Sequence, residues 1–190
     1  MKVLGIDPGS VFCGYGVIDI NGKTLSVIEY GTIEVKKKTD YFPARMKEIY
    51  NRIGAVIERT YPDTAAIEAA FYSKNAQSLI KLTMAKSAAI LAITNKNIDI
   101  KEYSAKEVKR SVTGRGNASK EQVSFMIKAM LNITESAEYY DTTDALAIAV
   151  CHYNNILRGI NLPKRNNNRT PKTSSWEKFL QENPDKIVKL

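Results

Sequence analysis

The chain has 190 residues, of which 44% are hydrophobic and 25% charged, and its 28 Lys and Arg against 20 Asp and Glu give a net charge of +8 at pH 7. This length suits one globular domain with an extension, and the composition excludes fibrous and wholly disordered classes of protein. The excess of positive charge favours a polyanionic partner, and nucleic acid is favoured over a membrane surface.

Cysteine usage and the N-terminal sequence bear on the compartment. Cys13 and Cys151 form no CxxC pair and no closely spaced set, which argues against a small secreted scaffold held by disulfides. The apolar run 2–6 ends at Asp7-Pro8-Gly9, far short of a signal segment or a membrane span. We therefore expect a reducing, cytoplasmic location.

Three strands are predicted at the start of the chain. Residues 2–6 are continuously apolar and run into the turn Asp7-Pro8-Gly9-Ser10, which places Asp7 at the end of a buried strand. Asn21-Gly22 separates the runs 14–20 and 24–35, and this dipeptide is typical of a type I′ hairpin turn. The chain therefore opens as an antiparallel meander.

Helices alternate with strands in the middle of the chain. Apolar residues at three-and-four spacing predict an amphipathic helix over about 41–60, and a short strand, 64–68, follows and ends in Glu68. A second helical pattern covers 75–93. A helix between two strands implies a parallel crossover, so we expect a mixed α/β sheet.

The last part of the chain is mainly helical. A strand over 98–103 precedes three predicted helices, over 104–111, 119–131 and 141–157. Ser119 and Gln122 have capping-box spacing. The segment beyond Gly159 is basic and poor in apolar residues, which is typical of disorder. We expect a domain over residues 1–158 and a flexible basic tail over 159–190.

Four acids stand out because of where they fall. Asp7 and Glu68 end predicted strands, while Asp141 and Asp144 are three residues apart in the first turn of a helix, on a common face and at the end that favours negative charge. Carboxylates of this kind suit Mg²⁺ or Mn²⁺, and two such ions catalyse phosphodiester hydrolysis. Each acid alone is better explained as a turn residue, a helix cap or an exposed strand end. The combination of all four points to a metal centre.

Three motifs around these acids resemble one family. They are Val3-Leu4-Gly5-Ile6-Asp7-Pro8-Gly9-Ser10 with Gly14-Tyr15-Gly16, Ile67-Glu68 followed by Phe71 and Lys74-Asn75-Ala76, and the run from Asp141 to Ala149. In this order, and over residues 1 to about 155, they resemble the RuvC family of Holliday junction resolvases.

The resemblance implies an RNase H-like fold, with a mixed five-stranded sheet flanked by helices, and a homodimer. It also implies Mg²⁺-dependent cutting of four-way DNA junctions by paired symmetric nicks, in recombination and repair, with two ions per site and Mn²⁺ as a substitute. Asp7, Glu68, Asp141 and Asp144 become the metal ligands, and Asp7 is expected to bridge the two ions. The branch-migration proteins RuvA and RuvB are the implied partners.

The resemblance also suggests groups that hold DNA. Lys109 and Lys120 match family positions near the scissile phosphate, and Lys120 also follows the Ser119 cap at a helix N-terminus, where backbone N–H groups favour phosphate. Phe71 matches a wedge-like aromatic. Further candidate DNA contacts are Tyr72, Lys74 and Asn75 close to Phe71, and Arg115 because of its charge in a flexible, glycine-bearing loop. The simpler interpretation is that the lysines are solvated and Phe71 is a core residue.

Some questions stay open at this point. His152 lies about 12 Å along its helix from Asp144, so we expect a structural or supporting role for it rather than metal ligation. The small residues around Met84 to Ala89 suit either a dimer face or the core. Rival functions are an actin-like ATPase or sugar kinase, for which 190 residues leave no second domain, an RNase H-like nuclease acting on RNA precursors, and a non-catalytic junction-binding module.

Overall fold

The computed structural model describes residues 1–22, 24–35, 40–70, 75–133 and 140–161, with residues 140–142 and 160–161 described by their backbone alone. The chain divides into two compact units, Met1–Gly159 and Ile160–Leu190. The second unit lies outside the described residues beyond residue 161, so the flexible character of the tail stays a prediction.

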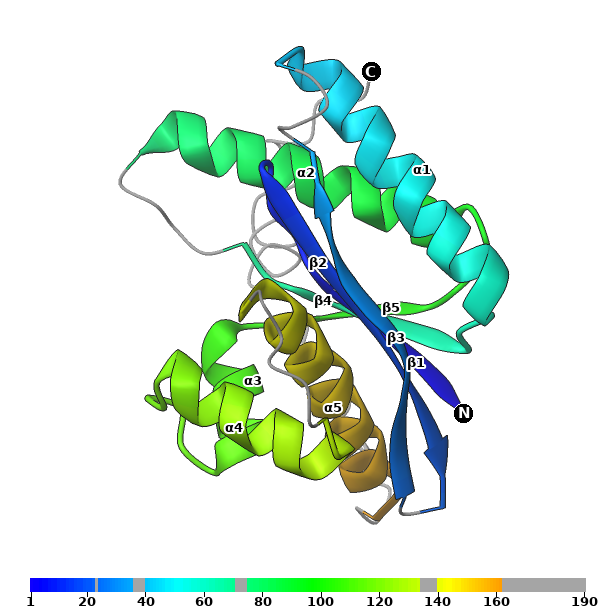
Figure 1. Cartoon of the computed structure of the whole chain (residues 1–190), viewed down its shortest axis with the longest axis vertical. Coiled ribbons are helices and arrows are strands. Elements are labelled where there is room, and N and C mark those ends of the chain that lie inside the picture. The colour runs from blue at the N-terminus through cyan, green and yellow to red at the C-terminus, as the bar shows by residue number, and fades with distance from the viewer. Residues whose placement is uncertain (23, 36–39, 71–74, 134–139, 162–190) are drawn as a thin grey trace, which may run out of the picture. The chain divides into compact units, whose positions relative to one another are not determined.

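A five-stranded mixed sheet forms the centre of the first unit, in the order β3-β2-β1-β4-β5 (Figure 1). The strands are β1 (Lys2–Asp7), β2 (Phe12–Asn21), β3 (Thr24–Glu34), β4 (Thr64–Glu68) and β5 (Ile100–Tyr103). The first three pair antiparallel, and β4 pairs parallel with both β1 and β5. The predicted meander, crossover and mixed sheet are confirmed.

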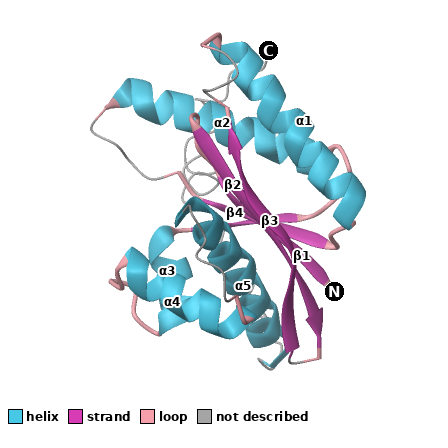
Figure 2. Ribbon diagram, in the orientation of Figure 1, coloured by secondary structure: helices cyan, strands magenta, loops and turns pink. Residues whose placement is uncertain are grey.

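Helices cover both faces of this sheet (Figure 2). One face carries α1 (Phe42–Thr60) and α2 (Ala76–Thr94), and the other carries α3 (Ala105–Thr113), α4 (Lys120–Leu131) and α5 (Tyr140–Asn161). Side chains alternate between the faces of a strand, so Leu4 and Ile6 join the core under α1 and α2, while Val3 joins the core under α5.

α5 lies directly on β1 and β2 because two glycines make room for it. A Cβ atom on Gly5 would lie 2.1 Å from the backbone oxygen of Ala145, and one on Gly16 would lie 2.7 Å from Cδ2 of Leu146. At Gly5 the obstacle is helix backbone and leaves no room for a side chain, whereas at Gly16 the Leu146 side chain would have to shift. The glycines therefore bring the first turns of α5 against the strand that ends in Asp7.

Capping boxes fix the starts of α3 and α4. Ser104 and Glu107 exchange hydrogen bonds at α3, and Ser119 and Gln122 do so at α4. Each box satisfies two N–H groups that a helix start would otherwise leave unpaired. The predicted box at Ser119 is confirmed, and it makes Lys120 the first residue of α4.

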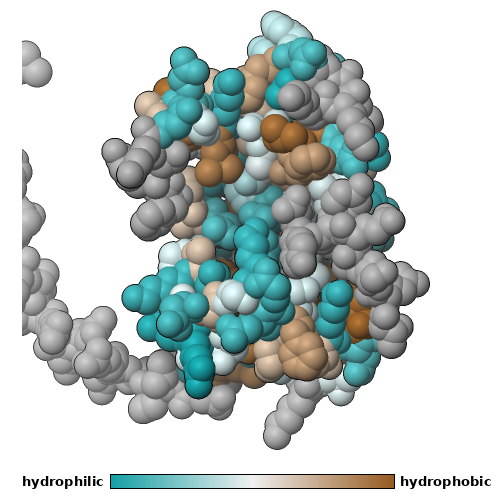
Figure 3. Space-filling view, turned by 60° about the vertical axis from the view of Figure 1, so that its left-hand side comes forward, coloured by the Kyte–Doolittle hydropathy of each residue, from teal (hydrophilic) through white to brown (hydrophobic). Residues whose placement is uncertain are grey.

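The small residues on the inner side of α2 belong to the protein core. Ala85, Ala88 and Ala89 are buried in the core that α2 shares with α1 and the sheet. Among the described residues, α2 is the one helix whose length and composition would allow it to cross a membrane. An apolar core helix meets the same test. On the face that Figure 3 shows, hydrophobic residues lie in separate patches with hydrophilic residues between them.

Candidate active site

Asp7 and Glu68 reach the same edge of the sheet because their strands run parallel. Ile6 pairs with Ile67, so the acid that follows each of them ends its strand at the same level. Alternation along β1 places Asp7 on the same face as Gly5, whose missing side chain would meet α5. Ala66, two residues before Glu68, lies in the core on that same face, so both acids end on the face of the sheet that carries α5.

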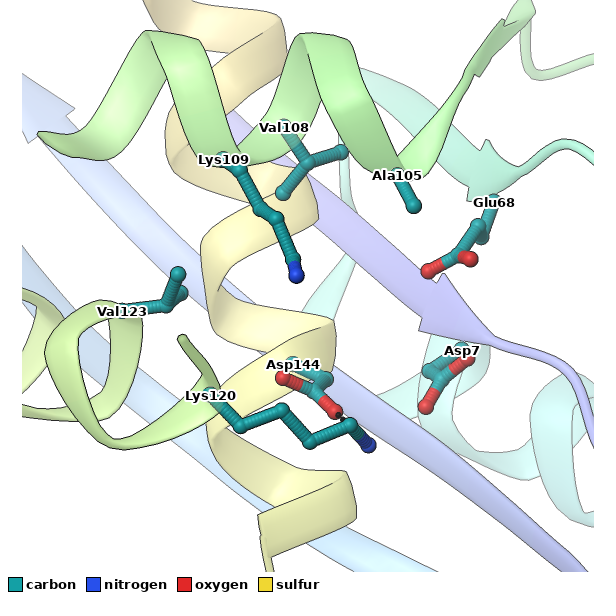
Figure 4. A pocket seen from close by; sticks show the side chains of 8 residues that line it. All are labelled: Asp7, Glu68, Ala105, Val108, Lys109, Lys120, Val123 and Asp144. Carbon is teal, nitrogen blue, oxygen red and sulfur yellow. Dashed lines mark hydrogen bonds and ion pairs between the residues drawn. The ribbon is translucent and has the colours of Figure 1, made fainter. Parts of the chain in front are cut away.

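The third acid comes from α5 itself. Asp144 precedes Ala145, the residue whose backbone covers Gly5, and its side chain lines the same cavity as Asp7 and Glu68 (Figure 4). The backbone of Asp141 lies in the first turn of α5, one turn before Ala145. The Asp141 side chain lies outside the description, so its part in the site stays a prediction.

The acids and both predicted lysines line one cavity of about 220 Å³. Lys109 projects into it from α3 and Lys120 from the start of α4 (Figure 4). Three apolar residues complete the wall, namely Ala105, Val108 and Val123. Sequence reasoning missed these three, although a signal was present for two of them. Ala105 lies four residues before Lys109 and Val123 three residues after Lys120, which is the spacing of one helix face.

The charges in this cavity interact directly. The Lys120 Nζ atom lies 3.0 Å from Oδ2 of Asp144, whose side chain is only 19% exposed. Burial raises the pKa of Glu68, and the negative charge of Asp144 raises it further, while the charges of Lys120 and Lys109 act in the opposite direction. Burial and the neighbouring carboxylate thus both disfavour the charged form of Glu68, and the two lysines offset these effects only in part.

The donor chemistry fits a hard divalent cation. Carboxylate oxygens from three elements face one cavity, and these are the ligands that Mg²⁺ and Mn²⁺ prefer. Within the described part of the chain, no three Asp, Glu, His or Cys side chains are close enough together to form a complete set of metal ligands. The acids therefore match a metal site in kind and place, without defining a coordination geometry.

The other predicted DNA contacts have different surroundings. The Asn75 Oδ1 atom accepts a hydrogen bond of 3.1 Å from the Ser78 backbone N–H, which caps α2. Arg115 lies away from the acids and lines a second cavity of about 490 Å³ beside α4, together with Phe125. Phe71, Tyr72 and Lys74 lie outside the described residues. A DNA contact by any of these residues stays a prediction.

His152 has a structural environment. Its ring is buried, and the Nδ1 atom lies 2.8 Å from the Tyr103 hydroxyl and the Nε2 atom 2.9 Å from the Thr64 hydroxyl. Thr64 donates its own proton to the Asp99 carbonyl, so the network assigns the His152 proton to Nε2 and lets Tyr103 donate to Nδ1. His152 is absent from the residues that line the acidic cavity.

Comparisons with known proteins agree with this arrangement. A family model described as crossover junction endodeoxyribonuclease RuvC matches residues 3–152. The chain is 43% identical over 190 residues to the crossover junction endodeoxyribonuclease RuvC of Chloroherpeton thalassium, covering 100% of both chains. It is 42% identical over 185 residues to that of Cytophaga hutchinsonii, covering 97% of this chain and 87% of the relative.

Solved structures give the same result. Thermus thermophilus RuvC in complex with a Holliday junction substrate superposes with a TM-score of 0.78 at 28% identity, covering 84% of this chain and 96% of that one. The yeast mitochondrial Holliday junction resolvase Ydc2 has a TM-score of 0.60 at 17% identity over 83% and 85% of the two chains, which supports the fold alone. With this fold, the acidic cavity and a match over nearly its whole length, the chain belongs to the RuvC family of metal-dependent crossover junction endodeoxyribonucleases.

Proposed function

We propose that this chain resolves Holliday junctions, cutting two opposing strands of a four-way DNA junction by paired, symmetric, Mg²⁺-dependent nicks during recombination and repair. The observation that carries the proposal is the cavity in which Asp7, Glu68 and Asp144 meet Lys109 and Lys120. Cations held by acids and lysines near the phosphate both stabilise the negative charge that develops when a phosphodiester is hydrolysed. Membership of the RuvC family supplies the junction as substrate.

The roles of the residues follow from their chemistry. Asp7, Glu68 and Asp144, joined by Asp141, would hold two Mg²⁺ ions, with Mn²⁺ as a substitute. Bound Mg²⁺ supplies Lewis-acid stabilisation of the charge that develops on the phosphate. Lys109 and Lys120 contact the scissile phosphate and counter the repulsion between DNA and the acids. Ala105, Val108 and Val123 limit the water beside the reacting phosphate, which strengthens these charge interactions.

The test is cleavage of a synthetic mobile four-way junction, with both cut sites mapped to the nucleotide. The wild-type chain should nick opposing strands symmetrically with Mg²⁺ and leave ends that ligase can seal. Asp7→Asn should lower the rate at least about a hundredfold because a metal ligand contributes several kcal/mol of transition-state stabilisation. Asp99→Asn, at an exposed position outside the cavity, is the matched control and should cut normally.

Two results would contradict this function. Tight junction binding by the wild-type chain without any cleavage in Mg²⁺ or Mn²⁺ would favour a binding module. Cleavage of structured RNA in preference to four-way DNA would favour the RNA-processing alternative.

We also propose that the chain acts as a homodimer joined through α2, because two symmetric nicks need two active sites. Ile80, Met84 and Leu91 are 56%, 51% and 56% exposed on the outer side of α2. With exposed Ser87 they repeat at intervals of four, three and four residues, which is the spacing of a seam between two packed helices. An apolar stripe of this kind is uncommon on a monomer.

The oligomeric state tests this interface directly. Light scattering after size-exclusion chromatography should give the mass of a dimer for the wild type and of a monomer for Met84→Glu. Phe125→Glu changes a residue that is 71% exposed on α4, away from the stripe, and should stay dimeric. A wild-type chain that is monomeric at micromolar concentration would contradict the proposed interface.

The family resemblance implies the partners, whereas the cysteine usage and the N-terminal sequence favour the compartment. We propose that RuvA and RuvB act on the same junction and that the chain works in the cytoplasm. Co-sedimentation of the chain with RuvA and RuvB on junction DNA would test the first proposal, and cell fractionation would test the second.

A further inference from the structure

We infer that Lys120 is the resident counter-ion of the acidic cavity: it occupies Asp144 before a metal ion arrives, and metal binding releases its ammonium group toward the DNA phosphate. The inference rests on the proposed function, since it assumes that Asp144 is a metal ligand. It adds a competition between a side chain and the metal that the proposed function does not contain.

The inference depends on the ion pair between Lys120 and Asp144, which are 24 positions apart in the sequence. The Lys120 Nζ atom lies 3.0 Å from Oδ2 of Asp144, and Figure 4 shows the lysine side chain extended across the carboxylate. A carboxylate oxygen that bears an ammonium group at this distance has one lone pair engaged. A divalent cation must therefore displace the ammonium group or share the carboxylate with it.

The Lys120 side chain is exposed enough to move away from Asp144. Its side chain is 61% exposed while that of Asp144 is 19% exposed, so the acid is held in place and the lysine can swing into solvent. A lysine ammonium is a compact charge on a flexible stem of four carbons. Because Lys120 is the first residue of α4, its backbone stays fixed by the Ser119 cap while the side chain moves.

Lys109 provides an internal comparison. It lines the same cavity and its charge acts on Glu68, as that of Lys120 does, and the described ion pairs place only Lys120 against one of the three cavity acids. Loss of either lysine removes one positive charge near the metal ligands. Only loss of Lys120 also removes a competitor for a ligand oxygen.

The test measures metal affinity without DNA. Mn²⁺ is titrated into the full chain, and free Mn²⁺ is followed by electron paramagnetic resonance. Lys120→Met keeps the length of the side chain without its charge and should tighten Mn²⁺ binding about threefold to fivefold, the range of a partly exposed ion pair. Lys109→Met should tighten binding less, by no more than about twofold, because it removes a nearby positive charge but no ion-paired competitor for a ligand oxygen. Lys120→Arg restores a positive charge and should return the affinity to that of the wild type.

A second measurement separates competition from a structural role. Lys120→Met should bind Mn²⁺ more tightly and yet cleave a junction more slowly at saturating Mn²⁺, because the released ammonium group is missing at the phosphate. A structural lysine would not shift these two quantities in opposite directions.

Two outcomes overturn the inference. Mn²⁺ affinity in Lys120→Met that is equal to or weaker than in the wild type removes the competition. An equal increase in Mn²⁺ affinity in Lys120→Met and Lys109→Met would show a general effect of charge and no competition by Lys120 for Asp144. Either result leaves the proposed function intact, whereas a wild-type chain that binds Mn²⁺ and never cuts junctions would overturn the proposed function instead.

Discussion

Gly5 and Ala145 are in contact through their backbones, and this contact sets the depth at which α5 lies on the sheet. A Cβ atom at residue 5 would lie 2.1 Å from the Ala145 oxygen and 2.7 Å from the Ala149 nitrogen. Both obstacles are helix backbone, which cannot move aside as a flexible side chain would. The position of Asp144 relative to Asp7 therefore depends on the absence of a side chain at residue 5.

Gly5→Ala should accordingly damage both stability and the site. Inserting a methyl group into a packed core costs about 1–3 kcal/mol, and here α5 must move away from β1. We expect a lower midpoint of urea unfolding and a large loss of junction cleavage. Gly54→Ala in α1 is the control, because its Cβ would meet nothing within 4 Å and alanine stabilises a helix interior by about 0.5–1 kcal/mol. A Gly5→Ala variant with normal stability and activity would show that α5 is free to shift.

His152 should titrate well below the usual range of histidine. Burial lowers its pKa from 6.5, and the positive charge of Lys101 lowers it further. The unfolded chain therefore takes up the proton first as the pH falls, so the contribution of His152 to stability is complete above about pH 6.5 and is lost as the pH falls through the folded pKa. His152 is the single histidine of the chain, so one ring signal in a nuclear magnetic resonance titration reports it. A midpoint at or above 6.5 would contradict the buried, neutral ring.

Glu68→Gln should stabilise the metal-free chain at neutral pH. The folded pKa of Glu68 lies above the ordinary value of 4.5, so the folded state binds the proton more strongly, and stability falls as the pH rises through that raised pKa. The variant should unfold at a higher temperature than the wild type at pH 7.5 in EDTA, and the gap should close below pH 4.5.

Adding Mg²⁺ should have the opposite effect on the difference in stability between the wild type and Glu68→Gln. It should stabilise the wild type more than Glu68→Gln, because a ligand that binds only the folded state raises its stability. Glu121→Gln is the control: the pKa of Glu121 is lowered by its hydrogen bond with Ser119, so this variant should gain no stability. Equal melting temperatures for Glu68→Gln and the wild type between pH 4.5 and pH 7.5 would contradict the raised pKa of Glu68.

Both cysteines should be unreactive in the folded chain. Cys13 and Cys151 are 0% exposed, and burial raises the pKa of the Cys151 thiol. Because the thiolate is the reactive form, Ellman's reagent should label neither thiol in native buffer and both after unfolding in guanidinium. Rapid labelling of one thiol in the native state would show local opening of the core around it.

Sequence reasoning located most of the site because strand ends and helix starts leave local signals. Asp7 and Glu68 each follow an apolar run, and their parallel strands bring them to one edge of the sheet. The contact of Lys120 with Asp144 had no such signal, since it depends on how α4 packs beside α5. The same is true of the approach of α5 to Gly5.

Among the element boundaries that differed from prediction, two have clear local reasons. α5 extends to Asn161 rather than ending near Leu157, because a glycine such as Gly159 weakens a helix by only about 1 kcal/mol and does not end it. β5 begins at Ile100 rather than Ile98, because Asn97 has φ of +56° and the Ile98 N–H bonds back to the end of α2. Turn geometry after a helix is decided by such contacts, which hydrophobic periodicity does not reveal.

The separation of the acids along the chain also has a consequence during synthesis. Asp7 and Glu68 come from the first strands, whereas Asp144 enters the cavity only when α5, the last described helix of the first unit, packs on Gly5. A nascent chain that ends before residue 140 would contain two of the acids and no functional nuclease. We therefore expect cutting activity to appear only after the domain is nearly complete.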